Sequence, residues 1–227
     1  MLNFKGIAGA AVVGLALASQ GAFASDNIDA TLNGFEYSGK NDAVTVDWSF
    51  NGSAWSKAYA GAFSGTFDLN SESFVSFCVE VTQKAAAWGS TASYTEASFS
   101  STVAGNLTNL ANKYYSSVSD SLTSAAFQMA VWEIVLEDGA FDLTSGAFKV
   151  KNSAEAISLA QSWLNGINDD NVLATGDYSL RYLQNGKYQD MLVLTPVPEP
   201  ATYGMLLLGM GLIGLFARRR STPVISA

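Results

Sequence analysis

Phe74-Val75-Ser76-Phe77-Cys78-Val79-Glu80-Val81 alternates between two sets of side chains. One face carries Val75, Phe77, Val79 and Val81, and the other carries Phe74, Ser76, Cys78 and Glu80. Successive strand residues point to opposite faces, so this pattern predicts a β-strand with one apolar side, with Cys78 in its middle.

Further strands are predicted on both sides of residues 74–81. Val44, Val46, Trp48 and Phe50 alternate up to an Asn51-Gly52 turn, and Ala58–Leu69 favours a second strand or a hairpin. Near the other end, Tyr178–Leu183 and Gln189–Leu194 flank Asn185-Gly186, which indicates a closing hairpin.

The middle of the chain has helical spacing. Apolar residues recur at intervals of three and four in two stripes, Leu107, Leu110, Ala111, Tyr114 and then Leu122, Ala125, Ala126, Met129, Trp132, Leu136. Asn152 and Glu155 resemble a capping box that opens a third helix. The prediction is an α+β domain with antiparallel strands at both ends around a central helical segment.

The C-terminus has three parts in order. Pro198-Glu199-Pro200 is followed by an uncharged apolar run, 201–217, and then by Arg218-Arg219-Arg220. The run predicts a short transmembrane helix, and the arginines predict that residues 221–227 form a short cytoplasmic tail. An ordinary membrane anchor is the alternative interpretation.

This order resembles the PEP-CTERM sorting signal of Gram-negative bacteria that make extracellular polysaccharide. The resemblance covers residues 197–220 and implies that an exosortase recognises the Pro-Glu-Pro motif and removes the hydrophobic tail. The protein would be anchored transiently in the cytoplasmic membrane and then reach the outer surface or the extracellular matrix, such as a biofilm. Because prolines disfavour helix and sheet, the motif is expected to stay extended and accessible.

The N-terminus indicates export. Lys5 precedes an apolar stretch, and Ala22-Phe23-Ala24 matches the small-residue site of signal peptidase. Residues 1–24 are therefore expected to be a cleaved signal peptide, with an uncleaved anchor as the alternative. Residues 25–196 remain as one exported domain.

Composition excludes several functions. All 20 acidic residues lie between Asp26 and Glu199, with eight of the 12 basic residues among them, so this region is unsuited to binding nucleic acid. The chain has no histidine, which rules out histidine-dependent triads and histidine-ligated zinc. We expect no metal, no cofactor and no enzyme activity. A carboxylate pair from the cluster Glu133, Glu137, Asp138 and Asp142 would still permit glycoside hydrolysis, although a solvated helix end is the simpler interpretation.

A single cysteine in an exported chain cannot form an internal disulfide, so Cys78 is either an inert buried thiol or a special one. The segments around Cys78 and around Phe127-Gln128-Met129-Ala130-Val131-Trp132 resemble the paired signatures of Cys-Gln thioester domains of surface adhesins. The resemblance implies that Cys78 attacks the Gln128 carboxamide, and Trp132 at i+4 could shield the bond. It departs from the family pattern at Phe127, where threonine is usual. If the resemblance fails, these helix residues are simply core.

Three functions follow from the sequence. The first is a sorted, adhesin-like surface or matrix protein that binds exopolysaccharide or a surface protein, with covalent attachment through Cys78 and Gln128. The second is a non-covalent structural component of the matrix. The third is a secreted carbohydrate-active enzyme.

Overall fold

The computed structural model describes residues 27–37, 43–137 and 139–197, together with Leu208, Met210 and Ile213. The expected signal peptide with Ala22 and Ala24, the Pro198-Glu199-Pro200 motif and Arg218 to Arg220 lie outside the described residues, as does most of the expected span 201–217. Within the described part of the chain, no helix is long and apolar enough to cross a membrane.

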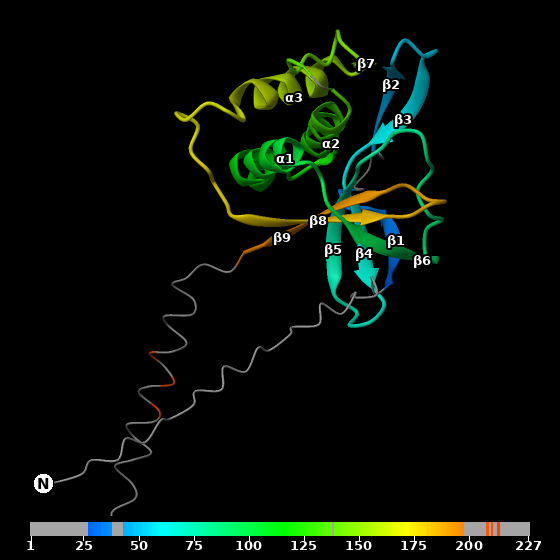
Figure 1. The fold of residues 1–227 in the computed structure, drawn as a ribbon, viewed down its shortest axis with the longest axis vertical. Helices are drawn as coiled ribbons and strands as arrows, with labels where there is room; N and C mark the ends of the chain where they lie inside the picture. The colour runs from blue at the N-terminus through cyan, green and yellow to red at the C-terminus, as the bar shows by residue number, and fades with distance from the viewer. Residues whose placement is uncertain are drawn as a thin grey trace, which may run out of the picture.

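Two antiparallel sheets make up the β-structure (Figure 1). A closed barrel has the strand order β1-β4-β5-β9-β8-β6, and a three-stranded sheet has the order β3-β2-β7. The barrel strands are β1 (Ile28–Phe35), β4 (Phe63–Phe67), β5 (Ser73–Cys78), β6 (Thr91–Ala97), β8 (Tyr178–Gln184) and β9 (Met191–Pro196). The smaller sheet contains β2 (Val44–Phe50), β3 (Ser56–Ala60) and β7 (Phe148–Lys151).

Three α-helices lie together beside the two sheets (Figure 1). They are α1 (Ser101–Tyr114), α2 (Ser121–Leu136) and α3 (Ala154–Gly166), and a single 3₁₀ turn, η1 (Tyr115–Ser117), follows α1. Helix α2 contacts α1, α3, the barrel strand β5 and all three strands of the small sheet. Every residue of α2 from Ser124 to Ile134 is buried, as expected of a helix that is surrounded on all sides.

The predicted fold class is confirmed as a mixed structure with antiparallel sheets, and the structure adds the closed barrel. The strand at 44–50, the three helices and the closing hairpin of β8 and β9 are present. The segment Ala58–Leu69 holds parts of two strands, but they do not pair with each other: β3 joins β2 in the small sheet, whereas β4 joins β1 and β5 in the barrel. The chain therefore crosses between sheets at Gly61-Ala62.

Two local predictions are wrong. The strand expected to reach Val81 ends at Cys78, so Cys78 is its last residue and not its middle. The capping box expected at Asn152 is absent: the N-cap of α3 is Ser153, which makes no side-chain cap bond. Asn152 has a positive φ of 69°, and its side chain is used elsewhere.

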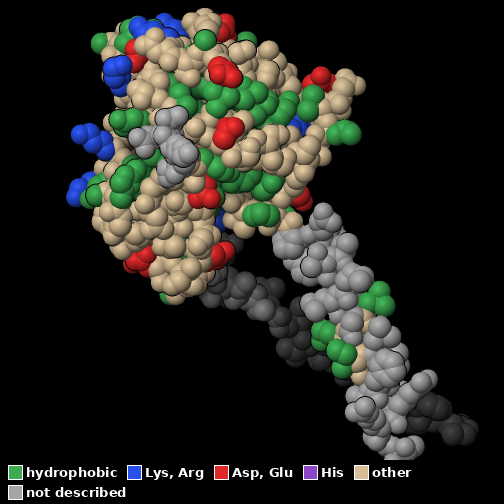
Figure 2. Space-filling view, turned by 180° about the vertical axis from the view of Figure 1, so that it is seen from behind, with side chains coloured by type: hydrophobic (Ala, Val, Ile, Leu, Met, Phe, Trp, Pro, Cys, Tyr) green, Lys and Arg blue, Asp and Glu red, His purple; other side chains and the backbone are tan. Residues whose placement is uncertain are grey.

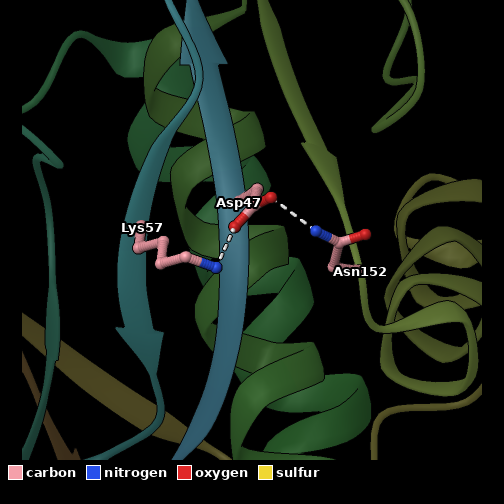
Figure 3. A network of polar contacts seen from close by, with 3 residues as sticks. All are labelled: Asp47, Lys57 and Asn152. Carbon is pink, nitrogen blue, oxygen red and sulfur yellow. Dashed lines mark hydrogen bonds and ion pairs between the residues drawn. The ribbon is translucent and has the colours of Figure 1, made fainter.

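The side-chain amide of Asn152 donates a hydrogen bond to Asp47 in the middle of β2 (Figure 3). Asp47 also accepts from the Lys57 Nζ on β3, at 3.1 Å. One carboxylate thus connects the neighbouring strand β3 with the turn that follows β7. This network fixes the small sheet to the start of α3.

Candidate functional site: the Cys78 and Gln128 pair

Strand β5 carries Cys78 into the interior of the domain. Cys78 pairs with Met191 of β9, and after it the backbone N–H of Val79 donates to the Asp190 carbonyl at 3.0 Å. The thiol belongs to the main hydrophobic core, with 2% of the residue exposed. Strand β5 and its pairing with β9 end at Cys78. On the opposite edge of the strand, the backbone N–H and carbonyl of Cys78 are available to bind a side chain.

Helix α2 brings Gln128 to this edge. Asp120 and Thr123 cap the start of α2 with a reciprocal capping box. One residue further on, the buried Ser124 Oγ accepts a hydrogen bond from the Ala62 backbone N–H at 2.8 Å. These contacts fix the first turn of α2 against the crossover between the two sheets. Gln128 lies one turn further along and is fully buried.

The Gln128 carboxamide makes two hydrogen bonds to the backbone of Cys78. The Cys78 N–H donates to Gln128 Oε1 at 2.8 Å, and Gln128 Nε2 donates to the Cys78 carbonyl at 2.8 Å. Two short bonds in this arrangement fix both the position and the plane of the amide. The structure therefore brings together the two residues that the sequence singled out, 50 positions apart.

The surroundings of Cys78 keep its thiol protonated. Burial raises the pKa of the Cys78 thiol well above its usual value, and the charge of Glu80 raises it further. The hydroxyl of Tyr94 is buried and has no hydrogen-bond partner in the part of the chain that the structure describes. Burial, followed by Cys78 and then by Asp190, raises the pKa of Tyr94 to about 12. The uncharged thiol of Cys78 and the uncharged hydroxyl of Tyr94 are therefore favoured.

Trp132 lies one helical turn after Gln128 and is almost fully buried. Its ring contacts Phe148 of β7 in an edge-to-face arrangement with centroids 6.1 Å apart. Its indole Nε1 is buried and finds no hydrogen-bond partner among the residues that the structure describes. Trp132 thus links the Gln128 face of α2 to the small sheet, and its suggested shielding role remains a prediction.

The acidic cluster at the end of α2 is not the solvated helix end that the sequence favoured, because Glu133 is buried inside the helix. Glu133 is completely buried, and its Oε1 accepts from the Asp142 N–H at 2.7 Å. Glu137 Oε2 accepts from the backbone N–H groups of Ala147 and Phe148. Asp142 accepts from Thr144 and Ser145 within its own turn. These carboxylates hold the chain between α2 and β7, and Asp138 lies outside the described residues.

The described residues hold no group of three or more Cys, Asp or Glu side chains placed to bind a metal ion. The candidate site is therefore described by the side chain of Gln128 and the thiol and backbone of Cys78 alone.

Residues 196–220 match the model of the PEP-CTERM protein-sorting motif. This match includes the Pro-Glu-Pro motif, the apolar run and the arginines. The motif implies recognition by an exosortase, export, and a location at the surface or outside the cell. No curated protein sequence matches the chain.

Solved structures similar to this chain include thioester domains of surface proteins. The N-terminal thioester domain of a surface protein from Clostridium perfringens is 19% identical, with 68% of this chain and 100% of that chain covered and a TM-score of 0.42. The corresponding domain of the fibronectin-binding protein SfbI from Streptococcus pyogenes is 14% identical, with 67% and 94% covered and a TM-score of 0.41. The N-terminal domain of the S. pyogenes pilus tip adhesin Cpa is 11% identical, with 70% and 97% covered and a TM-score of 0.44. Similarity of this size does not transfer chemistry between proteins, so any chemistry proposed for this chain has to be argued from its own residues.

Proposed function

We propose that the domain forms an internal thioester between Cys78 Sγ and Gln128 Cδ, and that this bond attaches the protein covalently to a partner outside the cell. The observation that supports the proposal is the pair of 2.8 Å hydrogen bonds between the Gln128 carboxamide and the Cys78 backbone. Because both groups of the amide are bound to the residue that carries the thiol, the electrophile and the nucleophile are held together.

The bond forms by acyl transfer. Cys78 Sγ adds to Gln128 Cδ, and the negative charge that develops on Oε1 is stabilised by the Cys78 N–H that already donates to it. The tetrahedral intermediate then expels Nε2, which takes the thiol proton and leaves as ammonia. A C–S bond replaces a C–N bond, no electrons are gained or lost, and the hydrogen bond from Nε2 to the Cys78 carbonyl is given up.

Burial both slows and protects this chemistry. A thiol whose pKa is raised gives little thiolate, so thioester formation is expected to be slow and to happen once, during or after folding. The same burial excludes water from the product, which limits hydrolysis. A hydroxyl or amine of the partner then attacks Cδ, forms an ester or amide with Gln128, and restores the Cys78 thiol.

Intact mass of the purified domain tests the proposal. The native protein is expected to weigh one ammonia less than its sequence, and Cys78→Ala and Gln128→Ala are each expected to show the full sequence mass. Gln184→Ala, a change at an exposed glutamine, should keep the ammonia loss. Methylamine should add to Gln128 in the native protein only. Full sequence mass in freshly folded native protein would remove the thioester.

The sorting signal supplies the location in this proposal. Signal peptidase would cut after Ala24, the segment 201–217 would hold the protein in the cytoplasmic membrane, and the exosortase would release it from this segment. Replacing Pro198 and Glu199 by alanine should abolish processing in cells with an active exosortase, whereas an exposed change such as Leu173→Ala should not. Unchanged processing of the double variant would leave the C-terminus as a simple anchor.

A further inference from the structure

A cleft of about 420 Å³ opens between the small sheet, the barrel and the segment 81–88. It is lined by residues of β2, β3 and β4, by the chain that follows Cys78, and by Trp132 of α2. The cleft therefore lies next to the segments that follow the two residues of the proposed thioester. Val81 comes three residues after Cys78, and Trp132 comes one helical turn after Gln128. The thioester chemistry itself does not use this cleft.

Aromatic rings form much of the lining. Trp88 contacts Phe63 with centroids 5.4 Å apart and Phe35 with centroids 5.5 Å apart, and Tyr59 meets Phe35 edge to face at 6.2 Å. Trp88 is nevertheless 49% exposed and Tyr59 is 62% exposed. Large rings that are fixed on one side and open on the other provide flat apolar surface for a ligand.

Two residues of the cleft lining also carry buried hydrogen-bonding atoms that the fold leaves unused. The Trp132 Nε1 donor and the Gln83 Oε1 acceptor are both buried, both belong to residues of the lining, and neither has a partner among the described residues. A buried polar atom without a partner is costly, so a ligand that binds it gains more than usual. An indole N–H needs an acceptor, which a hydroxyl provides and an alkylammonium group does not.

The charged residues of the cleft also limit the kind of ligand that it suits. Its charged lining residues are Lys84 and Lys57, of which Lys57 is paired with Asp47, and no Asp or Glu of the described residues lines it. In the space-filling view, several Lys and Arg side chains lie along one side of the molecule (Figure 2). The cleft thus suits a neutral or anionic ligand and disfavours a cationic one.

We propose that this cleft binds a carbohydrate, with a sugar ring against Trp88 and a sugar hydroxyl on Trp132 Nε1. Binding itself requires no thioester.

Oligosaccharide binding to the Cys78→Ala variant tests the site separately from the thioester, because this variant cannot form the covalent bond. Cellohexaose as a neutral probe and hexagalacturonate as an anionic probe should bind in calorimetric or NMR titrations, whereas the cationic hexamer of glucosamine should bind much more weakly. Trp88→Ala should raise the Kd roughly tenfold or more. Trp55→Ala is the matched control, since Trp55 is 45% exposed but lies outside the cleft lining.

Three results would overturn the carbohydrate site: no binding of either the neutral or the anionic probe at millimolar concentration, equal effects of Trp88→Ala and Trp55→Ala, or preference for the cationic probe. Binding by the Cys78→Ala variant together with full sequence mass in the native protein would keep the site and reject the thioester. Loss of ammonia in the native protein without any sugar binding would keep the thioester and reject the carbohydrate site.

Discussion

Glu133 and Asp142 are joined by a hydrogen bond in which the buried Glu133 Oε1 accepts the Asp142 backbone N–H at 2.7 Å. The second oxygen of Glu133 is buried without a partner. Burial raises the pKa of Glu133 to about 7, the bond from Asp142 opposes this, and the charges of Glu137 and Asp142 add to it. A carboxyl group thus titrates near neutrality inside the domain.

Glu133 should make stability depend on pH. Its pKa is about 7 in the folded protein and near the ordinary value of 4.5 in the unfolded chain, so between these values the folded state binds more protons. The free energy of unfolding should therefore fall as pH rises from about 4.5 to 7. Glu133→Gln keeps the acceptor and removes the charge, so it should flatten this slope and raise stability at pH 8 by roughly 1–2 kcal/mol. Denaturant unfolding at several pH values measures both effects. Glu155→Gln, in the exposed first turn of α3, should leave the slope unchanged.

Gln128→Glu should destabilise the domain by about 3 kcal/mol at neutral pH. The change replaces the Nε2 donor by an oxygen that faces the Cys78 carbonyl, and it places a carboxylate in a fully buried position. Protonation of the introduced carboxyl restores a donor, so the loss should shrink at acid pH. Thermal unfolding at two pH values measures this, with the exposed Gln184→Glu as the control. A pH-independent loss would contradict the hydrogen-bond geometry.

Two glycine-to-alanine changes should have opposite effects. At Gly65 on β4, a Cβ would overlap the ring of its cross-strand partner Phe74, which is buried and packs on Phe67 with centroids 4.4 Å apart. Gly65→Ala should therefore cost roughly 1–3 kcal/mol. Gly105 lies inside α1 with nothing near its Cβ position, so Gly105→Ala should stabilise by about 0.5–1 kcal/mol. Denaturant midpoints of the two variants compare them directly; a stabilising Gly65→Ala would mean that Phe74 can move aside.

Lys113 of α1 stabilises the end of α3. Its Nζ donates to the carbonyls of Gly166, Ile167 and Asp169 at 3.2, 2.9 and 2.9 Å. A cation at a helix C-terminus also interacts favourably with the helix dipole. Lys113→Met keeps the apolar stem and removes the donors, so it should lower the free energy of unfolding by roughly 1–3 kcal/mol. Lys187→Met, at an exposed lysine, should change it little, and equal effects would show that only overall charge matters.

The sequence singled out Cys78 and Gln128, which the structure places side by side, but it did not indicate how the sheets around them are arranged. Cys78 and Gln128 were recognisable because one is the only cysteine and the other lies in a strongly apolar helix. The order of the strands was not recognisable, since alternation identifies a strand but not its partners. Strand β6 shows this: only Ala92 and Tyr94 are buried in an otherwise polar stretch, so its pattern is weak.

The same limit explains why the burial around α2 was not foreseen and why no strand was predicted at β1. Helical spacing in α2 predicted one apolar stripe, but packing on all sides buries Gln128 and Glu133 as fully as the apolar residues. In β1, the register shifts between Leu32 and Gly34, which interrupts the alternation expected of a strand. Burial of polar groups and bulges depends on contacts between distant segments, which local periodicity does not contain.

Strand β9 has a consequence for the order of events in the cell. It is the last strand along the chain, it pairs with β5 from Val75 to Cys78, and it ends at residue 196, where the sorting motif begins. The ladder that holds Cys78 in place therefore cannot be completed until the chain has emerged up to the sorting motif. Maturation of the domain and display of the motif would then coincide, so that a protein stalled partway through export would carry neither an assembled Cys78 and Gln128 pair nor an accessible processing site.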